Sequence, residues 1–247
     1  MSNAVELPLP VALAKLVDTL SPPGVAEPVW EPKWDGYRAL VAGGRIWSRR
    51  GTDLSRYFPD LVPVLAAQLP GDLVLDGELV TWDTGTGRLD FAGLQARMTA
   101  GRSINDVAGL RPAQFVAFDV LVSDGRDLRD RPLRERRTEL ERALTGITSP
   151  IVVYQQTTDQ AVARQWFHTL TAGGIEGLVI KDAAGPYPTR TDQRVWWKVK
   201  AKVALDMVAI GFTGSATAPT SLVLAFPGRV DEAGTAVTAG SYEPAQT

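Results

Sequence analysis

Cysteine is absent from the 247-residue chain, and histidine occurs once, at position 168. Without a thiol the chain can form no disulfide, no cysteine nucleophile and no cysteine-ligated metal site. A Ser-His-Asp triad would have to use His168, and no Gly-x-Ser-x-Gly elbow supplies the serine. Zinc sites built on paired histidines are excluded too. We interpret His168 as a residue on the flank of an amphipathic helix.

Long apolar runs and the common nucleotide-binding loops are also missing. The longest apolar stretches, 115–122 and 203–212, are too short or too interrupted to span a bilayer. The N-terminus has no basic region followed by an apolar run. No Gly-Lys pair exists for a Walker A loop, and 85–87 lacks the third glycine of a dinucleotide fingerprint. We expect no membrane association and a cytoplasmic location.

Positive charge is supplied mainly by arginine. Only six of the 26 basic residues are lysines. An amine can lose its proton and attack, whereas a guanidinium cannot. A lysine in a chain that otherwise uses arginine therefore indicates a role for its amine. The net charge is −2 and the isoelectric point is near 5.5. A nucleic-acid binder is usually basic, so any DNA contact must come from local basic patches or from parts that are not in this chain.

The pattern of apolar residues predicts an α+β fold, because strands and helices mix without regular alternation. Residues 11–19 are expected to form a short helix or an extended segment. Residues 29–48 read as two strands joined around Gly43-Gly44. Further strands are expected in 73–82, 114–121, 151–155, 178–181 and 195–200. Residues 53–69 read as a loop that leads to a helix, 91–98 as the start of a helix, and 134–144 and 159–172 as helices.

The texture of the sequence changes after Lys202. Residues 204–212, 221–226 and 235–241 read as three short strands separated by Gly, Pro, Ser and Thr. We therefore expect a domain boundary near residue 201, with one domain in 1–200 and a β segment in 201–247. That segment is too short for a five-stranded barrel. Either the barrel is cut off, or the tail packs on the first domain.

Charged residues on otherwise apolar strands carry the chemistry. Buried acids are costly unless they pair with cations or a metal. Each motif alone is best explained as a solvated strand or a structural ion pair, but the ordered set predicts acids and lysines that share one polar cleft. The motifs are Glu31-Pro32-Lys33-Trp34-Asp35-Gly36-Tyr37-Arg38, Asp76-Gly77-Glu78, Phe118-Asp119-Val120, Glu176-Gly177-Leu178-Val179-Ile180-Lys181 and Trp196-Trp197-Lys198-Val199-Lys200.

This order of motifs resembles the covalent nucleotidyltransferases, which are ATP-dependent DNA ligases, RNA ligases and mRNA capping enzymes. The resemblance runs from about Glu31 to Lys200. The run from Glu31 to Gly36, the run from Pro132 to Arg137 and the Trp-Trp-Lys-Val-Lys motif are most similar to bacterial ATP-dependent DNA ligases of the repair type. The implied fold is a nucleotidyltransferase (ATP-grasp-like ligase) core of antiparallel sheets flanked by helices, followed by an incomplete OB-type β-barrel segment.

The resemblance implies that Lys33 attacks the α-phosphorus of ATP, forms a lysyl-AMP and passes AMP to the 5′-phosphate at a nick in duplex DNA. Neighbouring cations and partial desolvation would help Lys33 lose its proton. The resemblance further implies that Glu31 contacts the adenine amino group, that Phe118 stacks on the adenine ring, and that Arg38 and Glu78 hold the ribose. It implies that Glu176, with Glu78, binds a magnesium ion and that Lys198 and Lys200 bind the phosphates. Arg49, or Arg50 as the alternative, would contact AMP or the nick phosphate. Lys181, at its strand end, either supports the site or is simply exposed.

Two features depart from the family pattern. Between Tyr187 and Trp196 the family commonly has Pro-Gly and an arginine, and either Arg190 or Arg194 could replace that arginine. The basic motif expected late in the barrel domain does not occur. We therefore expect a truncated chain or natural fragment, with slow AMP transfer to Lys33 and poor nick sealing.

Two alternative functions stay open at this point. One is an RNA ligase or a GTP-using capping enzyme. The other is a non-catalytic module that binds nucleotide or a repair partner. The expected partners are nicked duplex DNA and other DNA-repair proteins, and the expected state is a monomer.

Overall fold

The computed structural model describes residues 7–170, 174–189, 195–201, 207–215, 217–230 and 236–242. The chain divides into two compact units, Met1–Ala201 and Lys202–Thr247. Within the described part of the chain, no helix is long and apolar enough to cross a membrane.

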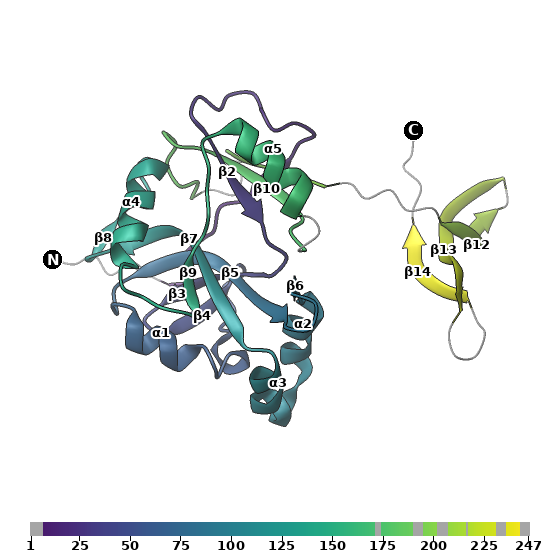
Figure 1. The fold of residues 1–247 in the computed structure, drawn as a ribbon, viewed down its shortest axis with the longest axis horizontal. Coiled ribbons are helices and arrows are strands. Elements are labelled where there is room, and N and C mark those ends of the chain that lie inside the picture. Colours follow the sequence, from purple (N-terminus) through teal and green to yellow (C-terminus); the bar gives the residue numbers. More distant parts are fainter. Residues whose placement is uncertain are drawn as a thin grey trace. The chain divides into compact units, whose positions relative to one another are not determined.

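The first unit contains a seven-stranded sheet and a four-stranded sheet (Figure 1). Neighbouring strands are antiparallel except for two parallel pairings at sheet edges, β7 with β9 and β1 with β11. The larger sheet runs β4(Arg45–Ser48), β3(Tyr37–Ala42), β5(Val74–Asp83), β7(Ala113–Ser123), β8(Arg126–Asp127), with β6(Arg88–Leu89) beside β5 and β9(Ile151–Val153) beside β7. The smaller sheet runs β1(Ala14–Leu16), β11(Trp196–Lys200), β10(Gly177–Asp182), β2(Pro28–Lys33).

Helices cover the outer faces of these sheets. Two of them begin at an aspartate whose carboxylate accepts a backbone N–H of the first turn, Asp90 from Gly93 at 2.9 Å and Asp159 from Ala161 at 2.7 Å. The helices are η1(Ser55–Tyr57), α1(Val62–Gln68), α2(Phe91–Thr99), η2(Gly101–Ser103), α3(Ile104–Leu110), α4(Leu133–Ala143) and α5(Gln160–Thr169).

Strand alternation divides the core into three clusters. On the outer face of the larger sheet, residues such as Leu75, Leu79 and Phe115 pack with α1, α2 and α4. On its inner face, residues such as Val80 and Val116 pack with Trp196 from the smaller sheet. The outer face of the smaller sheet packs on α5 (Figure 1). The two sheets therefore meet through their inner faces, and polar side chains at that junction can line a cleft.

The second unit is a three-stranded antiparallel sheet in the order β12(Val208–Ser215), β13(Ala218–Val230), β14(Ala236–Tyr242). Val208, Ile210 and Phe212 alternate along β12 and are about half exposed.

The predicted α+β fold of antiparallel sheets flanked by helices is confirmed, with corrections of detail. Residues 11–19 are extended around β1 and not helical. The prediction of two strands in 29–48 was wrong, because the turn at Asp35-Gly36 divides this segment into three. β3 and β4 form the hairpin at Gly43-Gly44, while β2 belongs to the other sheet. Helix α3 was not predicted.

A buried ion pair joins α4 to the larger sheet. The Arg136 guanidinium donates to both oxygens of Asp119, at 2.8 and 3.0 Å, and neither side chain is exposed. Asp119 was predicted to share a polar cleft with the site lysines. That prediction was wrong, since an arginine from α4 neutralises Asp119 in the core.

Replacing Arg136 with methionine is expected to lower the free energy of unfolding by about 3–5 kcal/mol. Methionine keeps much of the buried aliphatic volume but leaves the Asp119 carboxylate without its partner. The matched control is Arg134→Met on the same helix, whose pair with Glu27 at 3.2 Å is more than half exposed and should contribute at most about 1 kcal/mol. Denaturant titration measures both. Equal losses in the two variants would show that the Asp119 pair does not hold α4.

Candidate active site

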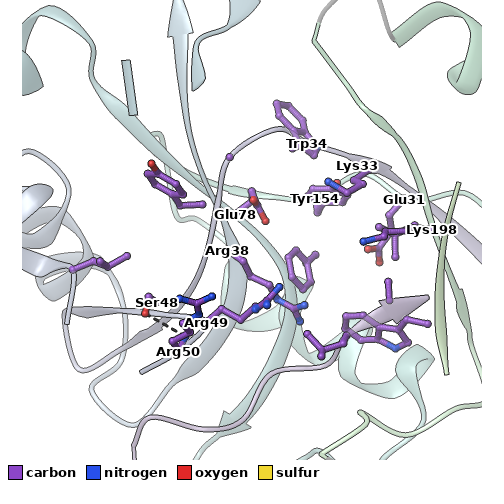
Figure 2. Close-up of a pocket in the computed structure, with 18 of the residues that line it drawn as sticks. Glu31, Lys33, Trp34, Arg38, Ser48, Arg49, Arg50, Glu78, Tyr154 and Lys198 are labelled. Atoms are coloured by element: carbon purple, nitrogen blue, oxygen red, sulfur yellow. Dashed lines mark hydrogen bonds between the residues drawn. The ribbon is translucent and has the colours of Figure 1, made fainter. Parts of the chain in front are cut away.

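A cavity of about 860 Å³ opens between the inner faces of the two sheets (Figure 2). Its walls come from segments far apart in the sequence. Glu31, Lys33 and Trp34 lie on and after β2, and Lys198 lies on β11 of the same sheet. The larger sheet and its connections supply residues that include Arg38, Arg49, Glu78 and Phe118. This volume is within the range of small-molecule and cofactor sites.

Lys33 ends β2 and points into this cavity. Its Nζ forms a close ion pair with the Glu176 carboxylate, and Lys200 Nζ lies 3.1 Å from the same carboxylate. The backbone is also tied, because the Glu176 N–H donates to the Lys33 carbonyl at 2.8 Å. The Lys33 and Glu176 side chains remain 25% and 28% exposed. The lysine is therefore held in place at the cavity and still accessible to a ligand.

A glycine fixes where Glu176 lies. Gly177 has φ +151°, and a Cβ there would lie 1.9 Å from the Val199 carbonyl oxygen. A side chain at 177 would push β10 away from β11, which carries Lys198 and Lys200. The glycine thus allows the close strand pairing that brings Glu176 and Lys200 beside Lys33.

A second close approach occurs where the chain passes from β2 to β3, because Gly36 lies directly against β5. A Cβ on Gly36 would lie 2.3 Å from the Leu79 carbonyl and 2.9 Å from Glu78 Cγ. The absence of a side chain at 36 lets the Lys33 segment run directly over β5. This contact places Glu78 among the residues that line the same cavity as Lys33.

One wall of the cavity combines aromatic rings with a buried ion pair. Lys181 Nζ donates to Glu31 Oε1 at 3.0 Å and lies 2.8 Å from Oε2. The same ammonium lies 4.6 Å from the centroid of the Phe118 ring and 4.1 Å from that of Trp196. Lys181 is only 1% exposed, so the alternative of an exposed strand-end lysine was wrong.

Arg38 is bound mainly by the protein itself. Its guanidinium donates to both oxygens of Asp76, at 3.0 and 2.6 Å, and to the Ala12 carbonyl. Tyr187 completes this network by donating to Asp76 at 2.5 Å. The guanidinium also lies 5.2 Å from the centroid of Phe118. These contacts connect Arg38 to the Phe118 ring and to the extended segment before β1.

The acids around the cavity differ in protonation. Burial raises the pKa of Glu78 to about 8, although Arg38 and Lys33 oppose the shift. Burial also raises the pKa of Asp35, and the nearby Glu176 charge adds to the effect. Burial acts the same way on Glu176, but the hydrogen bonds and charges of Lys33 and Lys200 outweigh it and lower its pKa. Glu176 is therefore the ionised acid beside Lys33.

Several basic residues lie close together at the cavity. Burial lowers the pKa of Lys198, and the charges of Lys33, Lys200 and Arg49 lower it further. Arg49 and Arg50 both line the cavity and are exposed (Figure 2), so the geometry does not choose between them. Arg190 and Arg194 lie outside the described residues.

The structure brings the predicted site residues together. Seven of them line one cavity. Glu176 pairs with Lys33 at this cavity, and Lys200 pairs with Glu176. Sequence reasoning missed several lining residues, namely Trp34, Tyr154 and Trp196, and the supporting pair Asp76 and Tyr187. The tryptophans lie within the recognised motifs, which was a usable signal. Nothing in the sequence singled out Tyr154 or Tyr187.

Among the described residues, no group of three or more His, Asp or Glu side chains could hold a metal ion. Glu176 is the ionised carboxylate nearest Lys33. Magnesium is commonly bound by one or two protein carboxylates together with substrate phosphates. The residues present fit a magnesium ion only as a companion of a bound nucleotide.

A two-sheet cleft with a lysine among cations, a carboxylate and an aromatic wall is the core architecture of covalent nucleotidyltransferases. Within that class, residues 12–200 match the family described as ATP dependent DNA ligase domain. The chain belongs to this family.

Curated relatives agree with this assignment. DNA ligase C2 of Mycolicibacterium smegmatis is 35% identical over 241 residues, covering 94% of this chain and 65% of that protein. DNA ligase C of Mycobacterium tuberculosis is 35% identical over 222 residues, covering 86% of this chain and 60% of that protein. The chain therefore spans somewhat less than two thirds of the length of these relatives.

Solved structures show the same fold. The mycobacterial DNA ligase D complexed with ATP and MES is 30% identical, with a TM-score of 0.58, and the match covers 94% of this chain and 72% of that one. A Lig E DNA ligase has a TM-score of 0.60 at 19% identity, covering 93% and 83% of the two chains, and supports the fold alone.

Proposed function

We propose that this chain is the nucleotide-binding core of an ATP-dependent DNA ligase, in which Lys33 becomes covalently adenylated. The observation that carries the proposal is the position of Lys33. It lies accessible in a cavity of nucleotide size, paired with an ionised carboxylate and close to Lys198 and Lys200. Family membership supports the same conclusion.

In the proposed first step the Lys33 amine attacks the α-phosphorus of ATP. A P–N bond forms, the bond from the α-phosphorus to the bridging oxygen breaks, and pyrophosphate leaves with those electrons. The proton released from Nζ passes to the Glu176 carboxylate, its direct partner, and from there to solvent. Lys198 and Lys200 offset the negative charge that builds up on the phosphates.

The cavity walls suggest where each part of the nucleotide binds. Phe118 offers a flat apolar ring for adenine, and Glu31 offers an acceptor for the exocyclic amino group. Glu78 is half-buried and contacts the ribose. We assign Arg38 a positioning role, because Asp76 and Ala12 already bind its guanidinium, and its predicted ribose contact stays a prediction. Arg49 or Arg50 contacts AMP or the nick phosphate.

Magnesium belongs to the proposal as well. Glu176 would hold it together with the nucleotide phosphates, and Glu78 stays a predicted second ligand. When bound, magnesium would neutralise phosphate charge and polarise the α-phosphoryl group.

In the proposed second step, AMP passes from Lys33 to the 5′-phosphate at a nick in duplex DNA. An oxygen of that phosphate forms a bond to the α-phosphorus as the P–N bond breaks. The exposed cations at the cavity mouth, Arg49 and Arg50, favour a polyanionic partner. Nicked DNA, other repair proteins, a monomeric state and a cytoplasmic location are parts of the proposal.

A label-and-chase experiment tests this function. The protein is incubated with ATP or GTP labelled at the α-phosphate, with magnesium, and separated under denaturing conditions. We expect stable label from ATP, and loss of that label to nicked DNA but not to nicked RNA on a chase. Label from GTP alone would favour a capping-type enzyme, transfer to RNA would favour an RNA ligase, and nucleotide binding without label would favour a non-catalytic module.

A further inference from the structure

The pair of Lys181 and Glu31 is built across two strands. In the register of β2 and β10, Val179 lies opposite Glu31 and Lys181 lies opposite Val29. Lys181 therefore reaches Glu31 along the diagonal, which is within the range of a long side chain. Its Nζ lies 3.0 and 2.8 Å from the two carboxylate oxygens. The side chains are 1% and 2% exposed.

A buried ion pair of this kind contributes little net stability to the fold. Removing two charges from water costs several kcal/mol per ion, and apolar residues of similar size often serve as well. The surroundings of Lys181 nevertheless favour its charged form, because its ammonium lies over the rings of Phe118 and Trp196. All four side chains line the cavity, so the pair lies where it can act on a bound ligand.

The Lys181 cation favours the ionised form of Glu31, against the net rise in its pKa that burial causes. Burial raises the pKa of Glu31, and the Asp119 charge adds to the shift, while Lys181 and Arg137 oppose it. Tyr154 is a further titratable group close to Glu31. An ionised carboxylate can only accept hydrogen bonds, whereas a protonated one can also donate. The state of Glu31 therefore decides which base edge it can bind.

We propose that Lys181 sets the base preference of the cleft: by pairing with Glu31 it keeps an acceptor-only carboxylate beside the base, which selects a 6-aminopurine over a 6-ketopurine. This inference rests on the proposed function. A carboxylate offers about four acceptor positions, so Glu31 can bind Lys181 and a base amino group together. A 6-keto oxygen would instead meet a second acceptor, with no hydrogen between them.

Equilibrium binding of AMP and IMP tests the proposal. The two bases differ only at the 6-position and the attached N1 proton, and neither nucleotide carries a pyrophosphate leaving group for reaction with Lys33. Calorimetry would use protein whose intact mass shows no attached AMP. We expect the unaltered protein to prefer AMP by about 10- to 100-fold, the range that corresponds to one hydrogen bond to a charged group. Lys181→Met should reduce that preference to about threefold or less.

A double-mutant comparison separates this role from structural damage. Glu31→Gln should remove the preference too, because the amide can donate to a keto oxygen. In the Glu31→Gln background, adding Lys181→Met should leave the AMP-to-IMP ratio unchanged, and that double variant has no unpaired buried charge. If Lys181 had only a structural role, Lys181→Met would weaken the binding of AMP and IMP equally and leave the AMP-to-IMP ratio unchanged. A lysine that itself donates to the base would make Lys181→Met raise the preference for AMP. Either result overturns the proposal.

The outcomes also separate this inference from the proposed function. Selective AMP binding that is lost in Lys181→Met, without covalent label from ATP, would retain the base-selection role and remove the adenylation. Covalent label from ATP, with an unaltered AMP-to-IMP ratio in Lys181→Met, would retain the adenylation and remove the base-selection role. An unaltered protein that binds neither AMP nor IMP overturns the base-selection proposal.

Discussion

Replacing Lys33 with arginine is expected to reduce covalent labelling by ATP to background. Arginine keeps the positive charge beside Glu176, so the ion pair and the fold should persist. A guanidinium does not lose its proton at any pH that proteins tolerate, and it therefore cannot act as the nucleophile. The measurement is label retained after denaturation, with thermal unfolding recorded in parallel.

Lys15 supplies the control for this substitution. It is exposed on β1 and does not line the cavity, so Lys15→Arg should label like the unaltered protein. Full labelling of Lys33→Arg would mean that another residue carries the adenylate.

Replacing Lys198 with methionine is expected to slow adenylation by about 100- to 1,000-fold, the usual cost of removing one group that stabilises transition-state charge. Lys198 lines the cavity from β11, which is separated from β2 and Lys33 by β10, and it lies opposite Val179 in the β10–β11 register. Because its charge matters most when pyrophosphate is leaving, the loss should fall more on the rate at saturating ATP than on the ATP concentration needed for half saturation.

Single-turnover labelling at several ATP concentrations measures both quantities. Lys15→Met is the matched control, with the same chemical change on an exposed lysine of the same sheet. If Lys198→Met changed only the half-saturating ATP concentration, Lys198 would bind the ground-state phosphates and contribute nothing to the chemical step.

Much of the fold could be predicted because apolar periodicity is local. The strands around Glu78, Phe118 and Lys198 were predicted close to their observed bounds, since each is an apolar run between turn residues. The division of 29–48 was missed because sheet membership is not local. β2 and β3 are separated only by Trp34, Asp35 and Gly36. β3 nevertheless pairs with β4 and β5, which follow it in the chain, whereas β2 pairs with β10, late in the unit.

The site shows the same limit. The order of motifs predicted which residues gather around Lys33. The structure places seven of the predicted residues at one cavity, with Glu176 paired to Lys33 and Lys200 beside Glu176. The order of motifs did not predict which acid pairs with which cation. Asp119 was expected to share a cleft with lysines, but it pairs with an arginine from α4. Glu31 was expected only to contact the base, and its pair with Lys181 was not predicted. Such choices depend on three-dimensional register and helix packing, which residue spacing alone does not specify.

The position of the adenylate tests the proposed role of Lys33 most directly. The protein would be incubated with ATP and magnesium, digested, and its peptides sequenced by mass spectrometry under conditions that preserve a phosphoramidate. If Lys33 is the nucleophile, one AMP is added to the peptide that contains Lys33, at that lysine. An AMP found on Lys198 or Lys200 instead, with Lys33 unmodified, would rule out Lys33 as the nucleophile.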